Sequence, residues 1–242
     1  MNRFVFIIPF RNVSSFIKEC AQSLLLQTNK NWIAIFCDDA STDNTINNIP
    51  PDERFIIKRN EERITALPNI HNGIMDSNLN DDDIICILDG DDALSRPDAI
   101  NIIDSLYQDD TLLTYGQYIA SIGNIGHCRP YTPDTFKCVR SSREYWASHL
   151  RTFKYKLYKE IMIQDPNLYC YKDNNGDFYK MTYDVAIVLP LLEMAGFDRV
   201  KFNPVPIYFY RIHPQNDYSV DPKLQYGIAD EIYRKPKFNQ IF

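Results

Sequence analysis

The first 110 residues contain four short apolar runs, and each run ends in polar residues that lead into a segment with helical spacing. The runs cover residues 4–8, 32–37, 55–58 and 84–88. Strands that are apolar along their whole length and alternate with amphipathic helices are typical of a parallel sheet covered on both faces. The sequence therefore predicts an α/β fold with a Rossmann-like, mostly parallel central sheet flanked by helices.

The pattern changes in the second half of the chain. Residues 112–120 predict a further strand, and residues 121–140 are rich in glycine and proline and show no regular period. We expect one helix at residues 141–161 and a second at residues 181–196. An extended segment follows at residues 200–217, where the prolines indicate an edge strand.

The composition indicates a globular protein that does not bind nucleic acid. Of the 242 residues, 45% are hydrophobic and 24% are charged, which is sufficient for a sizeable core. We expect a single domain over residues 1–242, with a larger half at residues 1–110 and a smaller, mixed half at residues 111–242. The net charge of −6, without a long Lys/Arg run, argues against a nucleic-acid partner.

The cysteines and the N-terminus bear on the compartment. The six cysteines occur singly, with no CxxC pair, which is typical of reduced thiols in a cytosolic protein. The first apolar run is interrupted by Pro9 and Arg11 and is too short for a signal peptide or a membrane span. We therefore expect a cytoplasmic protein without a transmembrane segment. Peripheral contact with a membrane and homo-oligomer formation both stay open.

Three polar segments directly follow predicted strands. They are residues 9–12, 38–41 and 89–92. Ligands of doubly wound sheets bind outside the carboxyl ends of the strands, so these segments are expected to converge on one crevice.

The acidic segment after the fourth strand is a candidate metal site. Asp89 and Asp91 have the spacing DxD, and two such carboxylates can face one ion. Hard oxygen ligands suit Mg²⁺ or Mn²⁺, which can in turn bridge a diphosphate. The alternative is a solvated loop whose acids favour a helix start, because Asp92 and Asp98 lie near Pro97.

Three stretches, taken together, resemble a known enzyme family. They are "FIIPFRN", "SLLLQTNKNWIAIFCDDASTDNT" and "ILDGDDAL", in this order and at this spacing. The combination resembles family 2 glycosyltransferases of the GT-A fold. The resemblance implies transfer of a sugar, with inversion, from a nucleotide-diphosphate sugar, with a UDP-sugar as the expected donor. It also implies Mn²⁺ or Mg²⁺ as cofactor, a donor half at residues 1–110 and an acceptor half at residues 111–242.

The resemblance also assigns roles to residues of the donor half. The residues carried over to donor binding are Pro9, Phe10, Arg11, Asn12, Asp38, Asp39, Asp89 and Gly90. In this reading Asp39 accepts from the base N–H, Asp89 faces the ribose or the metal, and Asp91 is the principal metal ligand. Two positions depart from the family pattern, since Arg11 stands where an aromatic residue is common and Pro68 where an arginine is usual.

Two segments of the acceptor half carry further implied roles. The stretch "TYDVAIVLPLLEMAG" is similar to the segment that carries the family's general base, which implies that Asp184 deprotonates the acceptor hydroxyl. The alternative for Asp184 is a helix N-cap. The stretch "YFYRIHPQND" is similar to the segment that completes metal or diphosphate binding, which implies His213 as a third metal ligand and Arg211 as a diphosphate contact. An ordinary surface or core histidine is the alternative for His213.

Residues 141–161 are rich in aromatic and basic side chains. Trp146, His149 and Arg151 could form a wall for an acceptor sugar, because aromatic rings pack on sugar C–H faces and polar side chains bond hydroxyls. The same segment could instead touch a membrane that carries a lipid-linked acceptor, or simply pack into the core. The acceptor itself, whether glycan, glycolipid or protein, is not indicated.

Two rival functions remain open. A phosphohydrolase of the haloacid dehalogenase type would use Asp89 as nucleophile and Asp91 as acid, but it expects Thr or Val at position 93, where this chain has Ala93. A binding protein that keeps the pocket without catalysis is the second alternative, and the departures at Arg11 and Pro68 favour it.

Overall fold

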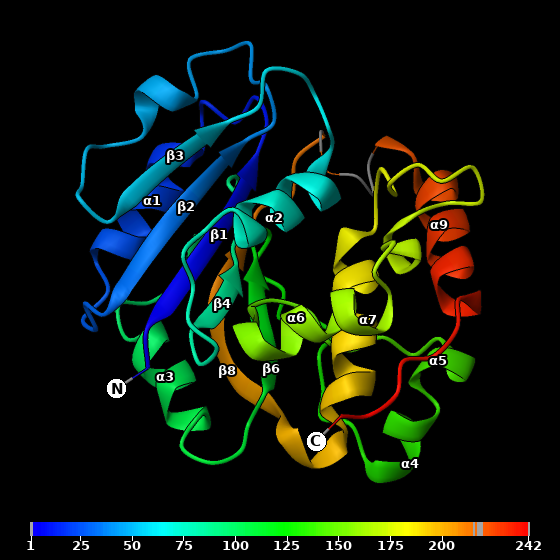
Figure 1. Ribbon diagram of the computed structural model, residues 1–242. Coiled ribbons are helices and arrows are strands. Elements are labelled where there is room, and N and C mark those ends of the chain that lie inside the picture. The colour runs from blue at the N-terminus through cyan, green and yellow to red at the C-terminus, as the bar shows by residue number, and fades with distance from the viewer. Residues whose placement is uncertain (1, 215, 217–219, 242) are drawn as a thin grey trace.

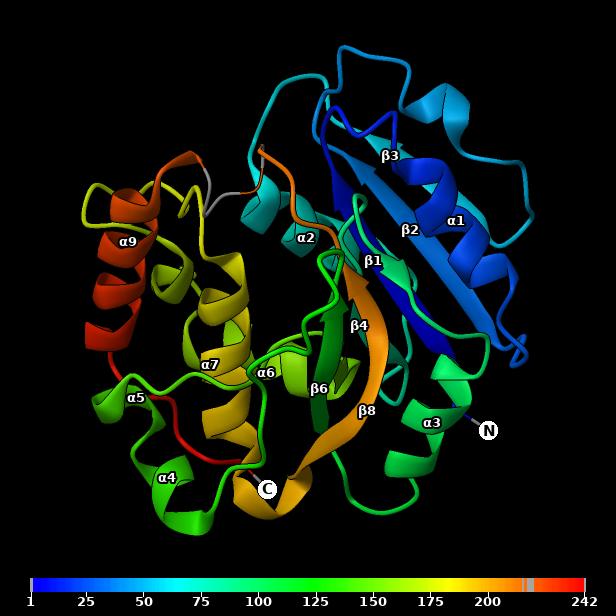
Figure 2. The same cartoon turned by 180° about the vertical axis from the view of Figure 1, so that it is seen from behind.

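The structure, a computed structural model, describes residues 2–214, 216 and 220–241. Within these residues, eight strands form one mixed sheet in the order β3-β2-β1-β4-β7-β6-β8-β5. Helices cover both faces of this sheet (Figures 1 and 2). The α/β fold with a Rossmann-like central sheet is therefore confirmed.

The sheet has a parallel part and a mixed part. Its strands are β1 Phe4–Phe10, β2 Trp32–Asp38, β3 Phe55–Arg59, β4 Ile84–Ile87, β5 Ala93–Leu94, β6 Leu113–Ala120, β7 Arg151–Lys154 and β8 Val200–Tyr210. The strands β1 to β4 pair only in parallel with one another, whereas β7 lies antiparallel to both β4 and β6. Because β4 and β7 are hydrogen-bonded, one continuous sheet joins the two halves of the chain.

The helices follow the alternation that the sequence predicts in the first half. They are α1 Ile17–Leu25, α2 Ala66–Met75, α3 Ala99–Leu106, α4 Pro133–Lys137, α5 Val139–Ser142, α6 Tyr155–Gln164, α7 Tyr183–Ala195 and α9 Pro222–Arg234. Single turns of 3-10 helix occur at Ile46–Asn48, Tyr169–Tyr171 and Phe197–Arg199. In the described part of the chain, no helix combines the length and the apolarity needed to cross a membrane.

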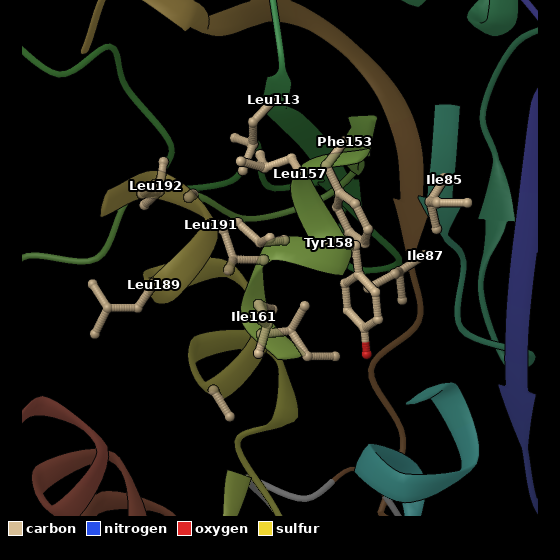
Figure 3. Close-up of a cluster of buried hydrophobic side chains, with 14 of the residues drawn as sticks. Ile85, Ile87, Leu113, Phe153, Leu157, Tyr158, Ile161, Leu189, Leu191 and Leu192 are labelled. Carbon is tan, nitrogen blue, oxygen red and sulfur yellow. The ribbon is translucent and has the colours of Figure 1, made fainter. Parts of the chain in front are cut away.

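Two hydrophobic layers enclose the sheet. Alternate side chains of β1 point to opposite faces, so Phe4 and Phe6 pack with α1 and α3, whereas Val5 and Ile7 pack with α2. The second layer continues under α6 and α7 (Figure 3). Within α7, every residue from 185 to 195 is buried, and all of them are apolar except Glu193, which forms an ion pair with Arg140 at 2.6 Å.

The prediction of one helix at residues 141–161 is wrong. The segment contains α5, a connection, the strand β7 and the start of α6. β7 pairs with β4 through Ile87 and Arg151 and fills the position beside β4 that would otherwise be an open edge. The helical spacing was misleading because α5 precedes and α6 follows the strand β7, which has only four residues.

The edge position expected for the extended segment is only partly found. β8 pairs with β6 on one side, and on its other side it meets only the two residues of β5. Residues 215 and 217 of the predicted segment lie outside the described residues.

Candidate active site

A cavity of about 290 Å³ lies at the carboxyl ends of β1, β2 and β4. The predicted site residues that line it are Pro9, Phe10, Arg11, Asp39, Asp89, Asp91, His149, Arg151, Asp184 and His213. The predicted residues that are not among its lining are Asn12, Asp38, Gly90, Trp146 and Arg211. The cavity thus brings together three loops of the first half, the start of β7, the start of α7 and the segment after β8.

Asp39 is held by backbone amides. Its two carboxylate oxygens accept hydrogen bonds from the N–H groups of Ile64, at 2.6 Å, and Thr65, at 3.1 Å. The Arg11 guanidinium donates to the carbonyl oxygens of Asp39, at 2.5 Å, and Ala40, at 2.6 Å. The Asp39 bonds hold the loop after β2 against the loop before α2, and the Arg11 bonds hold it against the loop after β1. This wall of the cavity is therefore preorganised.

Asp38 and Asn12 support the same loop from outside the cavity. The buried Asp38 carboxylate accepts from the Ser41 N–H at 2.9 Å and lies 3.3 Å from Arg59 Nε. Asn12 adopts a left-handed conformation, with φ of 54°, and its side-chain oxygen accepts from the Thr42 N–H at 2.8 Å. Asparagine tolerates this conformation better than most residues do.

Gly90 lets the acidic loop pack against the end of β1. A Cβ atom at this position would lie 2.6 Å from the Cβ of Phe10, a separation that real Cβ contacts do not show. Only glycine allows the chain to approach so closely, and this approach places Asp89 and Asp91 on either side of the contact.

Two tyrosines from the second half hold the acidic loop. The Tyr183 hydroxyl donates to Asp89 Oδ1 at 2.5 Å, and the Tyr208 hydroxyl donates to Asp92 Oδ2 at 2.6 Å. The Tyr208 oxygen also accepts from the Asp89 N–H at 3.2 Å. Sequence reasoning missed both tyrosines. Tyr183 could have been found, because it precedes Asp184 in the same first helical turn, whereas nothing local signals Tyr208.

The expectation that Asp92 helps the next helix begin is wrong. Asp92 is 1% exposed and also accepts from the Arg211 N–H at 2.7 Å. The helix α3 begins only at Ala99, with Asp98 as N-cap and without a side-chain capping bond. Asp92 therefore joins the acidic loop to the end of β8.

Asp91 and His213 meet at the mouth of the cavity. His213 Nε2 lies 2.7 Å from Asp91 Oδ2, and the two side chains are 12% and 22% exposed. Arg211 takes a different direction, since its Nε donates to the Asp91 carbonyl oxygen at 2.9 Å and its guanidinium bonds Glu19 at 2.5 Å. In this conformation Arg211 braces the acidic loop and does not reach the cavity.

The acidic loop concentrates negative charge that a cation would offset. The pKa of Asp89 is raised to about 7, chiefly by burial and then by the charge of Asp91, although the Tyr183 hydrogen bond and Arg151 act to lower it. Burial, followed by the charges of Asp91 and Asp89, also raises the pKa of Asp92 well above its usual value. Like charges packed together in this way are costly without a counter-ion.

The donor atoms fit a divalent metal. Asp91 and His213 are in contact at 2.7 Å, and with the neighbouring Asp89 they offer carboxylate oxygens and an imidazole nitrogen, which are ligand types that divalent metals accept. The group whose ligand atoms lie within 4.8 Å of one another is a second one, Asp89, Asp92 and His149. That second group is less suitable, because both Asp92 oxygens are already taken by Tyr208 and Arg211.

Asp184 also lines the cavity, where it lies beside Arg151. Arg151 Nη2 donates to Asp184 Oδ2 at 3.1 Å, and the two side chains are 4% and 27% exposed. Burial lowers the pKa of Arg151, but Asp184 and its other acidic neighbours raise it by more, so the guanidinium stays charged. The N-cap interpretation of Asp184 is wrong, because Thr182 is the N-cap and Asp184 belongs to the first turn of α7.

Of the three predicted acceptor-wall residues, His149 and Arg151 line the cavity and Trp146 does not. His149 stacks on Tyr208, with ring centroids 4.3 Å apart, and burial lowers its pKa well below the usual value, so a neutral ring lines the cavity. Trp146 stacks on Tyr131 at 4.9 Å and carries Arg129 over its other side at 3.9 Å. Trp146 thus belongs to an aromatic cluster outside this cavity.

The family model described as glycosyl transferase family 2 matches residues 5–167. A curated relative is the glycosyltransferase GlyG of Streptococcus pneumoniae serotype 4 (strain ATCC BAA-334 / TIGR4), which is 22% identical to this chain. The match covers 78% of this chain and 76% of GlyG. The chain belongs to glycosyl transferase family 2, and the resemblance in the sequence motifs is confirmed.

Solved structures share the fold. TarS 1-349 of S. aureus in complex with UDP has a TM-score of 0.63 at 14% identity, over 96% of this chain and 69% of that chain. The mannosyltransferase PcManGT of Pyrobaculum calidifontis, in complex with GDP-Man and Mn²⁺, has a TM-score of 0.60 at 17% identity, over 90% of this chain and 59% of that chain. A longer TarS structure has a TM-score of 0.62 at 13% identity over 90% of this chain, which spans only 38% of TarS.

Proposed function

We propose that this protein transfers a sugar from a nucleotide-diphosphate sugar to an acceptor hydroxyl, with inversion and with a divalent metal. The observation that carries the proposal is that Asp89, Asp91 and Asp184 line the same cavity. A UDP-sugar is the first donor to test, because TarS structures are described in complex with UDP and with UDP-GlcNAc. A GDP-sugar is the second, given the GDP-Man complex of PcManGT.

The donor is held by the first half of the chain. The loop fixed by Asp39 and Arg11 forms the nucleoside wall, and Asp89, Asp91 and His213 are the residues that would hold the metal. When bound, a divalent ion offsets the negative charge on the departing nucleoside diphosphate. Mn²⁺ is the preferred ion, because an imidazole in the ligand set favours it over Mg²⁺.

Asp184 is the residue that activates the acceptor hydroxyl. Asp184 takes the hydroxyl proton while the acceptor oxygen bonds to the anomeric carbon and the bond from that carbon to the diphosphate oxygen breaks. A single displacement of this kind inverts the anomeric centre. Arg151 holds Asp184 through Oδ2 and so orients the carboxylate toward the cavity. A positioned base of this type contributes roughly 10²–10⁴-fold to rate.

A donor screen tests the proposal. The thermal midpoint is measured with UDP-glucose, UDP-galactose, UDP-GlcNAc, UDP-GalNAc and GDP-mannose, each with Mn²⁺ and with EDTA. We expect one donor to raise the midpoint in Mn²⁺ only and to be hydrolysed slowly to nucleoside diphosphate, with inverted sugar as product.

Other outcomes separate the rivals. Stabilisation by a donor without any release of nucleoside diphosphate would favour a binding protein. Hydrolysis of p-nitrophenyl phosphate, with no response to any nucleotide sugar, would favour a phosphohydrolase and contradict the proposal.

A further inference from the structure

A second hollow lies beside the active-site cavity. It measures about 570 Å³, within the range of roughly 300–1,000 Å³ that is typical of ligand sites. The turn before α7 forms one side and α9 the other (Figure 1). The residues that line this hollow, here called the α9 groove, are Asp173, Phe178, Tyr179, Lys180, Asp221, Lys223, Leu224, Gly227, Ile228 and Glu231.

The α9 groove continues into the active-site cavity along two segments. Lys180 lines both spaces, and Thr182, two residues later, already lines the cavity. On α9, Leu224 lines the groove while the adjacent Gln225 lines the cavity. The Thr182 hydroxyl donates to the Gln225 carbonyl oxygen at 3.3 Å, which ties the two segments together where the spaces meet. The groove therefore starts next to the wall that carries Asp184.

The surface of the α9 groove suits uncharged sugar residues. Phe178, Leu224 and Ile228 supply aromatic and apolar surface, against which the C–H faces of sugars pack. Around them stand three carboxylates and two ammonium groups, and one of the carboxylates, Glu231, already accepts from the Tyr179 hydroxyl at 3.2 Å. Such groups bond sugar hydroxyls, but their nearly balanced charge gives no advantage to a polyanionic chain.

Gly227 keeps the middle of the groove open. It lies inside α9, where glycine is destabilising relative to alanine, and a Cβ atom added to it would meet nothing within 4 Å. No close packing in the described structure therefore calls for glycine at this position. The absent side chain leaves free space in the groove.

We propose that the α9 groove binds a neutral glycan chain, namely the sugar residues of the acceptor that follow the reacting hydroxyl. This proposal rests on the proposed glycosyl transfer and names its acceptor class. It also moves acceptor recognition from Trp146, which lies outside the active-site cavity, to the turn before α7 and to α9.

Chain-length kinetics test the proposal. Transfer from the best donor is measured to maltotetraose, cellotetraose, chitotetraose and mannotetraose and to the matching monosaccharides. We expect the best tetrasaccharide to have a KM at least tenfold below that of its monosaccharide. Gly227→Ala, Gly227→Leu and Gly227→Trp should reduce this ratio in the order of side-chain volume, and Phe178→Ala should reduce it as well.

A control variant on the same helix is Tyr226→Ala. Tyr226 is 66% exposed and lines neither the groove nor the cavity, so the KM ratio should stay at the wild-type value. The thermal midpoint of each variant is recorded, so that a folding defect is recognised separately from a change in the KM ratio.

Three results would overturn the proposal. The first is an equal KM for tetrasaccharide and monosaccharide, and the second is a ratio that Gly227→Trp leaves unchanged in a folded protein. The third is transfer to none of the four tetrasaccharides by protein that hydrolyses a nucleotide sugar, which would leave the proposed function standing. Failure to release nucleoside diphosphate from any donor would instead overturn the proposed function, and this proposal with it.

Discussion

The proposed donor side and the proposed acceptor side of the cavity are built by different means. On the donor side, polar groups of separate loops bond one another, as Asp39 bonds the amides of Ile64 and Thr65. On the acceptor side, the mostly apolar α7 packs into the core, and the α9 groove keeps exposed apolar surface such as Leu224, which is 43% exposed. The donor wall is thus fixed before a ligand arrives, whereas the acceptor surface stays open.

This difference predicts which substitutions should reduce stability and which should alter the choice of acceptor. A wall held by hydrogen bonds loses stability when one partner is removed, because a buried donor is left unsatisfied. An open surface tolerates substitution, and changes there are expected to alter the choice of acceptor and leave the fold intact. Five predictions test this contrast, in order of decreasing effect.

The largest effect is expected for Asp184→Asn. The amide cannot take the acceptor proton, so transfer should fall by about 10²–10⁴-fold while donor binding, measured by thermal shift, is kept. Asp184→Glu retains a carboxylate and should lose less activity than the asparagine variant. If Asp184→Asn transfers sugar at more than a tenth of the wild-type rate, Asp184 is not the base.

Asp91→Asn should separate activity from stability. Transfer and Mn²⁺ affinity are expected to fall by at least about 100-fold, because a principal ligand is lost. The thermal midpoint without metal should be unchanged or higher, because the charge of Asp91 raises the pKa values of Asp89 and Asp92. Asp98→Asn, an exposed carboxylate paired with Arg96, is the matched control. Wild-type Mn²⁺ affinity in isothermal titration calorimetry would exclude Asp91 as a ligand.

Asp39→Ala should behave in the opposite way. The amides of Ile64 and Thr65 would lose their acceptor, which is expected to reduce the free energy of unfolding by about 1–3 kcal/mol. Urea denaturation measures this change. A variant as stable as the wild type would show that the donor wall does not depend on these bonds.

Gly227→Ala should stabilise the protein. A methyl group at this position meets no neighbour and removes the cost of glycine inside a helix, so a gain of about 0.5–1 kcal/mol is expected in the same denaturation assay. A loss of stability would mean that α9 does not tolerate a side chain there and would weaken the idea of an open acceptor side.

The smallest effect on stability is expected from His71, which contacts Tyr158 between the two halves of the chain. His71 of α2 lies 2.9 Å from the Tyr158 hydroxyl of α6, and burial lowers its pKa below the usual 6.5, although Asp76 raises it slightly. The unfolded chain therefore binds this proton more readily than the folded protein does. Stability should be fully present above pH 6.5 and should fall as the pH drops below it. His71→Gln should flatten the dependence, and equal slopes in both proteins would contradict the assignment.

Much of the donor side is predictable from the sequence. Apolar runs that end in polar residues define the carboxyl edge of a parallel sheet whatever the details of the helices, so residues such as Pro9, Asp39 and Asp91 could be placed in one crevice. Whether these side chains touch the donor remains a prediction. The structure adds that Asp39 also has a structural role, because its oxygens face backbone amides.

The acceptor side was much less predictable. β7 has only four residues, and its pairing with β4 depends on a segment more than 60 positions earlier in the chain. Strand formation depends on such tertiary context more than helix formation does. The same distance hides Tyr208, which is 116 residues from Asp92 and carries no local mark of its role.

The antiparallel pairing of β7 with β4 determines where the Arg151 side chain lies. Because β7 runs antiparallel to β4, Arg151 pairs with Ile87, and Ile87 lies two residues before Asp89. The Arg151 side chain lines the cavity. The side chain of the next residue, Thr152, points the other way and bonds Tyr107 and Thr114. Side chains alternate along a strand, so a register slip of one position would exchange these two environments. A slip of β7 by one position against β4 would therefore take the Arg151 guanidinium out of the cavity and away from Asp184.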